Sequence, residues 1–174
     1  MCLRLLALRP RTRAELATAL RRRAVPDEVA ESVLERYSEV GMIDDAAFAE
    51  AWVTSRHHGR GLARRALGHE LRRKGVDSPT VSRALDQLDP DTERETAEAL
   101  VRRRLRTLSG APPDAAFRKL VGMLARKGYS AGLSVRVVRD AVAEAAEAAE
   151  LELDALVDAA DAADAAEFQP CPTG

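Results

Sequence analysis

Aromatic residues are scarce in this sequence, and so are cysteines and long apolar runs. Aromatics make up 3% of the 174 residues, so a core must be built from Leu, Val and Ala, which favours helices over sheets. Cys2 and Cys171 stand far apart and form neither a disulfide framework nor a metal-ligand cluster. No apolar run approaches the roughly 20 residues that cross a bilayer. The arginine-rich opening also lacks the cleavage site of a secretory signal. These absences predict a soluble, cytoplasmic, helical protein that spans no membrane.

Hydrophobic residues nevertheless make up 46% of the chain, which is enough to form a core and excludes wholesale disorder. The net charge of −1 conceals a strong asymmetry. All 27 lysines and arginines lie within residues 1–139, beside 18 acids, whereas residues 140–174 contain 10 acids and no lysine or arginine. The basic body favours polyanions or acidic protein surfaces as partners. The alternative is that the surface helices simply carry many solvated arginines.

A repeated segment organises the chain. It begins at Leu16, Leu67 and Leu120, at offsets of 51 and 53 residues, and each copy has the pattern Leu-x3-Leu-x-(Arg/Lys)2-small-apolar. Three copies at nearly constant spacing indicate three structural units. Apolar residues at spacings of three and four precede and follow each copy, as in amphipathic helices, so each unit is expected to contain three helices.

The flanking apolar stripes define the outer helices of each unit. The preceding stripes are Leu5 and Leu8; Phe48, Trp52 and Ser55; and Val101, Leu105 and Leu108. The following stripes are Val29, Val33 and Tyr37; Val81, Leu85 and Leu88; and Val135, Val138 and Val142.

Start and stop signals support these helices. The expected starts are capping boxes at Thr12–Glu15 and Thr92–Glu95, an N-cap at Ser78, and acidic caps at Asp44 and Asp45. Gly41, Gly75 and Gly128 stand at the expected helix exits, where a left-handed backbone favours glycine. The expected units are residues 1–40, 44–90 and 92–144.

Three short helices bury little surface alone, so the units are expected to stack. The predicted fold is all-α: a tandem array of three three-helix, helix-turn-helix-like repeats, elongated and curved. Residues 145–174 are expected to form an acidic, Ala-rich tail that is partly helical or disordered, with disorder after Pro170. The tail is either a weak electrostatic brake that competes for the basic surface or an appendage that aids solubility.

No pattern for catalysis or metal binding is present in the sequence. Gly59-Arg60-Gly61 lacks the Gly-Lys-Ser/Thr ending of a phosphate-binding loop. His57, His58 and His69 lack the cysteine or carboxylate spacing of a zinc site and are expected to be solvated. The chain is therefore predicted to be a non-enzyme with no cofactor and no metal.

Basic runs are the strongest candidates for a binding surface. Runs at the end of each repeated segment would line up along one face of a stacked array and could follow a phosphate backbone or an acidic groove. The alternative is that these cations only complement the helix dipole or are solvated. The predicted binding residues are Arg21, Arg22, Arg23, Arg64, Arg65, Arg72, Arg73, Lys74, Arg102, Arg103, Arg104, Arg126 and Lys127.

One segment resembles a known family. Residues 41–49, Gly-Met-Ile-Asp-Asp-Ala-Ala-Phe-Ala, are similar to the Gly-apolar-Ile-Asp-Asp-x-x-Phe-Ala signature of RecX, the bacterial regulator of the RecA recombinase. In that family the signature lies between the first and second repeats. Residues 2–6, 9–16 and 71–76 also resemble the family's first two repeats, and the resemblance covers residues 2–144. Family members commonly carry a polar stretch ahead of the first repeat, whereas this sequence opens almost at the repeat.

The resemblance implies a monomeric repeat protein that lies in the groove of the RecA filament. It would suppress strand exchange, ATP hydrolysis and co-protease activity in DNA repair, recombination and the SOS response, without catalysis of its own. Two alternatives remain: a stand-alone module that binds single- or double-stranded DNA, and a helical-repeat adaptor for another protein. No unit has an evident recognition helix with Asn, Gln and Arg placed to contact base edges. Binding that requires RecA would separate the regulator from the DNA-binding module.

Overall fold

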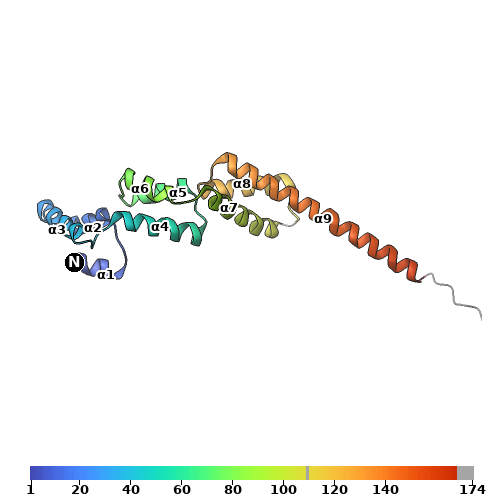
Figure 1. The fold of residues 1–174 in the computed structure, drawn as a ribbon, viewed down its shortest axis with the longest axis horizontal. Coiled ribbons are helices and arrows are strands. Elements are labelled where there is room, and N and C mark those ends of the chain that lie inside the picture. The colour runs from blue at the N-terminus through green and yellow to red at the C-terminus, as the bar shows by residue number, and fades with distance from the viewer. Residues whose placement is uncertain (109, 168–174) are drawn as a thin grey trace, which may run out of the picture.

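The protein is almost entirely helical. The structure, a computed structural model, describes residues 1–108 and 110–167, which form nine α-helices, one 3-10 turn and no β-strand (Figure 1). The expected all-α fold class is therefore confirmed. The elements are α1 (Cys2–Leu8), α2 (Arg13–Arg21), α3 (Asp27–Glu39), α4 (Asp45–Arg60), α5 (Arg64–Arg73), α6 (Ser78–Asp86), α7 (Pro90–Leu105), η1 (Arg106–Leu108), α8 (Pro113–Arg126) and α9 (Ala131–Glu167).

The helices form three successive units: α1–α3, α4–α6 and α7–α9. Packing is mostly within a unit, with α2 against α3, α4 against α5 and α6, and α9 against α7 and α8. The three units follow one another in an elongated, gently curved row, and α9 extends beyond its end (Figure 1). This arrangement confirms the expected tandem array of three-helix repeats.

Each unit has its own hydrophobic core, centred on the repeated segment. Leu16, Leu67 and Leu120, which begin the three copies, are fully buried, as are Leu71 and Leu124 further along the second and third copies. Burial of one such side chain contributes about 1.5–3 kcal/mol. The repeated leucines therefore account for much of the stability of each unit.

Two helices begin at residues other than those expected. The Thr92–Glu95 pair is not a capping box, because α7 begins two residues earlier at Pro90 and its N-cap is Asp89. Proline is favoured in the first turn of a helix, and here it sets the start. Similarly, Asp77 rather than Ser78 caps α6 and accepts a hydrogen bond from the Thr80 N–H at 2.9 Å.

The apolar stripe expected on α3 is wrong at Val29, whereas Tyr37 packs against the first core as expected. Val29 is 53% exposed, whereas Ala30 and Leu34 are buried in the first core. Valine carries the stronger hydrophobic signal in the sequence, but the small Ala30 side chain lies on the face that packs in the core. The outward face of α3 therefore includes a valine that sequence spacing alone assigns to the core.

The third unit continues into the acidic tail without a break, because α9 crosses residue 144 as one helix. Val138 is fully buried in the third core, whereas Leu153 and Leu156 are 62% and 69% exposed. Figure 1 shows this part of α9 leaving the body. The disorder expected after Pro170 concerns residues outside those that the structure describes.

Candidate functional site

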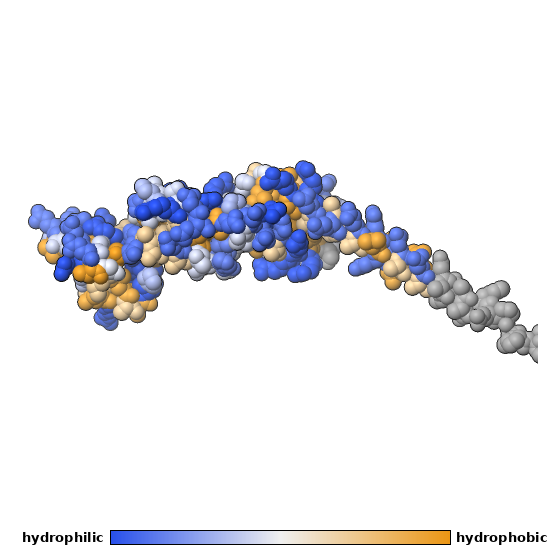
Figure 2. Space-filling view, in the orientation of Figure 1, coloured by the Kyte–Doolittle hydropathy of each residue, from blue (hydrophilic) through white to orange (hydrophobic). Residues whose placement is uncertain are grey.

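Three of the predicted cationic runs lie at the C-terminal ends of the middle helices α2, α5 and α8. The arginines of these runs, from Arg21–Arg23 to Arg72, Arg73 and Arg126, are exposed. The two lysines, Lys74 and Lys127, are only partly exposed. The exposed cations contribute to the largely hydrophilic surface in Figure 2.

The C-terminal end of α5 meets the start of α2, and the C-terminal end of α8 meets the start of α5. Thr12, the N-cap of α2, donates its hydroxyl hydrogen to the carbonyl oxygen of Lys74 at 2.7 Å. Ala63, the N-cap of α5, donates its backbone N–H to the carbonyl oxygen of Lys127 at 2.9 Å. The α5–α2 and α8–α5 contacts therefore join corresponding helix ends, and they define the first and second repeat junctions.

A carboxylate from the first turn of a neighbouring helix completes each junction. Asp45 Oδ1 accepts a hydrogen bond from the Arg13 backbone N–H at 2.9 Å. Glu93 Oε1 accepts one from the Arg64 backbone N–H, also at 2.9 Å. Burial raises the pKa of Asp45, and the Arg13 N–H opposes that shift. These bonds satisfy backbone donors that helix starts would otherwise leave unpaired.

Glycines allow the close approach at both junctions. Gly75 has φ +80°, and a Cβ at this position would lie 2.3 Å from the Ala14 Cβ. Gly128 has φ +91°, and its Cβ would lie 2.5 Å from the backbone nitrogen of Ala66. Only glycine provides both the left-handed backbone and the missing side chain.

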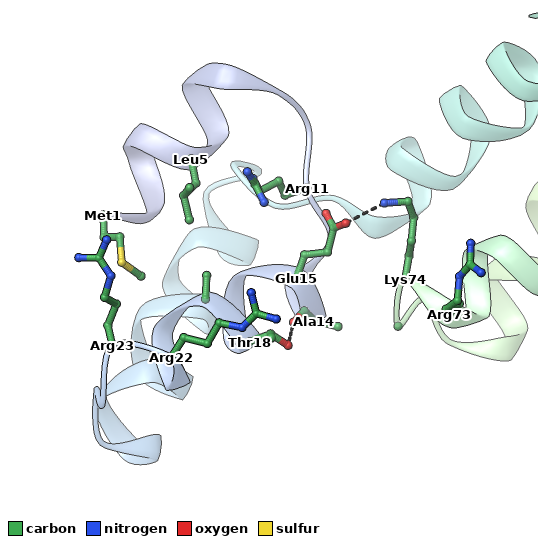
Figure 3. Close-up of a pocket in the computed structure, with 12 residues that line it drawn as sticks. Met1, Leu5, Arg11, Ala14, Glu15, Thr18, Arg22, Arg23, Arg73 and Lys74 are labelled. Carbon is green, nitrogen blue, oxygen red and sulfur yellow. Dashed lines mark hydrogen bonds and ion pairs between the residues drawn. The ribbon is translucent and has the colours of Figure 1, made fainter.

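Lys74 stabilises the first junction through internal contacts. Its Nζ donates a hydrogen bond to Glu15 Oε1 at 2.7 Å (Figure 3). The same Nζ lies 4.3 Å from the centre of the Trp52 ring. Burial alone would raise the pKa of Glu15, but the hydrogen bond and charge of Lys74 hold that pKa below its ordinary value. This predicted binding residue therefore already has a partner within the protein.

A pocket of about 580 Å³ lies beside this pair and is named the first junction pocket (Figure 3). It brings together four of the predicted cations: Arg22, Arg23, Arg73 and Lys74. Arg11 also lines it and was not predicted. Arg11 belongs to no basic run. The signal that could have identified it is its position directly before the N-cap residue Thr12.

A second junction pocket of about 650 Å³ lies at the equivalent end of α8. Lys127 Nζ donates a hydrogen bond to the carbonyl oxygen of Arg60 at 2.5 Å. Burial, and then the charge of Arg103, lower the pKa of Lys127. Arg106, which continues the Arg102–Arg104 run in the sequence, also lines the pocket. Arg60 lines it too and was missed, although it stands where α4 ends.

The remaining predicted cations lie outside both pockets. Arg64 pairs with Asp86 at 2.9 Å, and Arg102 pairs with Glu98 at 3.5 Å. The two pockets together collect six of the predicted residues, and the others are spread over the surface. Those outside the junction pockets are Arg21, Arg64, Arg65, Arg72, Arg102, Arg104 and Arg126.

His57 lies at the boundary between the second and third units. The expectation that it is solvated is wrong: it is 1% exposed, its Nδ1 lies 2.9 Å from the Leu62 carbonyl oxygen, and its Nε2 lies 2.9 Å from Thr96 Oγ1. His58 and His69 are exposed, as expected. Adjacent positions on a helix point in different directions, and the third unit covers only one of them.

Replacing His57 by alanine is expected to lower the free energy of unfolding by about 2–4 kcal/mol, because a cavity forms and buried polar groups lose their partner. Urea denaturation followed by circular dichroism measures this change. His58→Ala is the matched control and should change the free energy by less than about 0.5 kcal/mol. Equal, small effects of the two substitutions would contradict the structural role of His57.

Within residues 1–108 and 110–167, no three His, Cys, Asp or Glu side chains are grouped to hold a metal ion. The helices of this part of the chain include none that is long and apolar enough to cross a membrane.

Models of the three RecX domains match the three units. The first three-helix domain matches residues 1–36, the second residues 44–85 and the third residues 91–138. The chain belongs to the RecX family. The regulatory protein RecX of Thermobifida fusca is 60% identical over 154 residues, which cover 88% of this chain and 81% of that protein. RecX of Streptomyces coelicolor is 58% identical over 150 residues, covering 86% and 80% respectively.

Solved RecX structures share the fold. A crystal structure of regulatory protein RecX matches with a TM-score of 0.72 and 24% identity, covering 80% of this chain and 68% of that one. The structure of RecX from Lactobacillus salivarius matches with a TM-score of 0.73 and 19% identity, covering 80% and 90%. The row of three helical units is thus a RecX fold.

Proposed function

We propose that this RecX protein binds RecA nucleoprotein filaments and inhibits their recombinase, ATPase and co-protease activities in bacterial DNA repair and recombination. The observation that carries this proposal is the repetition of the junctions: two pockets lined by several cations lie at successive boundaries of an elongated array. A surface of this form suits an extended partner that repeats its own charged groups. Its relatives in Thermobifida and Streptomyces are regulatory proteins.

The protein would act by binding alone, in the cytoplasm, as a monomer. Inhibition then requires only that the bound array hinder growth or rearrangement of the filament. No cofactor is needed for such a role.

Adding the protein to RecA on single-stranded DNA is expected to lower the rate of DNA-dependent ATP hydrolysis. Co-sedimentation with the filament should accompany the loss of ATPase activity. Naked DNA without RecA is the control, and binding there should be weaker at equal salt. An unchanged ATPase rate together with undiminished binding to naked DNA would contradict the proposal.

The second candidate function is direct binding of single- or double-stranded DNA. The exposed Arg102–Arg104 run on α7 favours it, because arginines contact phosphates and release counterions. Such binding would fall steeply with salt and would not need RecA. The naked-DNA control therefore also tests this candidate.

A further inference from the structure

The two repeat junctions can be compared, because each joins the end of one middle helix to the N-cap residue of another. Lys74 and Lys127 both follow the last residue of a middle helix, and their carbonyl oxygens accept hydrogen bonds from the Thr12 hydroxyl and the Ala63 backbone N–H respectively. Glu15 is the third residue of α2, and the third residue of α5 is Ala66. The carboxylate that pairs with the lysine in the first junction is therefore replaced by alanine in the second.

A second difference accompanies the first. Trp52 stands seven residues after the junction carboxylate Asp45, and seven residues after Glu93 stands Leu100. In the first junction the tryptophan ring lies against Lys74, whereas Leu100 lines the second junction pocket. The second lysine thus lacks both the acidic and the aromatic neighbour of the first.

The second junction pocket is rich in positive charge. Arg60, Arg103, Arg106 and Lys127 line it together with His58, and none of its described lining residues is acidic. Concentrating like charges at a partly buried site is unfavourable, and a low local dielectric strengthens the repulsion. The lowered pKa of Lys127, caused by burial and then by Arg103, is consistent with this.

We infer that the second junction pocket binds a carboxylate side chain from an acidic segment of a protein partner, which would pair with Lys127 as Glu15 pairs with Lys74 in the first junction. Leu62, Ala99 and Leu100 also line the pocket and provide apolar contact for the aliphatic part of a glutamate. A phosphodiester would present a polar sugar there instead, so a protein segment fits better than DNA. This inference rests on the proposed function, because the RecA filament is the partner that supplies the acidic segment.

An internal carboxylate tests this pocket without any knowledge of the partner. Ala66→Glu introduces a glutamate at the helix position that corresponds to Glu15, and Ala66→Gln is its uncharged control. Ala51→Glu adds the same charge on an exposed site of α4, about 14 Å along the helix from Arg60, which is more than a Debye length at physiological salt. Circular dichroism melts establish that each variant is folded, and Arg103→Gln is a second variant that leaves the junction contacts intact.

The probes are fluorescently labelled poly-L-glutamate and a dT oligonucleotide of matched charge, with affinity measured by anisotropy. Ala66→Glu should weaken poly-glutamate binding about tenfold relative to Ala66→Gln, and Arg103→Gln by about threefold. Ala51→Glu should weaken it by less than about twofold. Equal losses for Ala66→Glu and Ala51→Glu would overturn the inference, and so would a larger loss for the oligonucleotide than for poly-glutamate.

Co-sedimentation of the same variants with RecA filaments separates the two proposals. Ala66→Glu should bind filaments about tenfold more weakly than Ala66→Gln. Equal filament binding by these two variants would refute the pocket and leave the proposed function in place. Failure of every variant, including the unmodified chain, to bind filaments would refute the proposed function, and the poly-glutamate result would still decide on the pocket.

Discussion

Replacing Gly128 by alanine is expected to lower the free energy of unfolding by about 2–4 kcal/mol. Two effects add. The residue has φ +91°, a conformation that costs an L side chain roughly 1–2 kcal/mol. The new methyl group would also lie 2.5 Å from the backbone nitrogen of Ala66, so α8 must move away from α5. The second junction would then lose the hydrogen bond between Ala63 and Lys127.

Two other glycines separate these effects in urea denaturation. Gly41 has φ +71° but open space around a Cβ, so Gly41→Ala should show only the conformational cost of about 1–2 kcal/mol. Gly59 lies inside α4, also with open space, and Gly59→Ala should stabilise the protein by about 0.5–1 kcal/mol. If Gly128→Ala costs no more than Gly41→Ala, the close approach at the junction is refuted.

Reversing the charge of Arg72 and Arg73 is expected to weaken binding to the filament on the order of a hundredfold at low salt, with the loss shrinking as salt increases. Both side chains are exposed at the end of α5, and Arg73 lines the first junction pocket. Lys74, the third cation of this run, is left unchanged because its contacts with Glu15 stabilise the fold. Co-sedimentation at two salt concentrations measures the effect.

A matched reversal isolates the contribution of position from that of net charge. Arg118 and Lys119 are adjacent, exposed cations on α8 that belong to neither junction pocket. Changing both to glutamate alters the net charge equally but should weaken binding by no more than about fivefold. His58→Gln should have little effect. If the two double reversals weaken filament binding equally, binding depends only on the net positive charge of the protein and not on the position of the cations.

The positions of the repeats were predictable because burial imposes a strict spacing on leucines. Leu16, Leu67 and Leu120 could be aligned from sequence alone, and all three are fully buried. Gly75 and Gly128 were likewise placed at helix exits by their residue type. Local sequence determines these features, since each depends on one helix and its nearest turn.

Features that depend on contact between units were not predictable in the same way. Lys74 and Arg73 look alike as members of one basic run, yet only the lysine is paired with a carboxylate 59 residues away. His57 and His58 are sequence neighbours, and which of them is buried depends on where α7 docks. The identity of the opposing residue at a junction is set by another repeat, and no pattern within a single repeat encodes it.

The end-to-end contacts of the middle helices bear on why their cations are there. α8, α5 and α2 form a head-to-tail series, in which the carbonyl end of one helix meets the amide end of the next. Opposite partial charges therefore offset each other at both junctions. Within this series only α2 presents a carbonyl end that no further middle helix meets, and Arg21–Arg23 lie at that end. Compensation of the helix dipole thus explains the basic run of α2 best. It explains the runs of α5 and α8 least, because the start of another helix already offsets the dipole at those two ends.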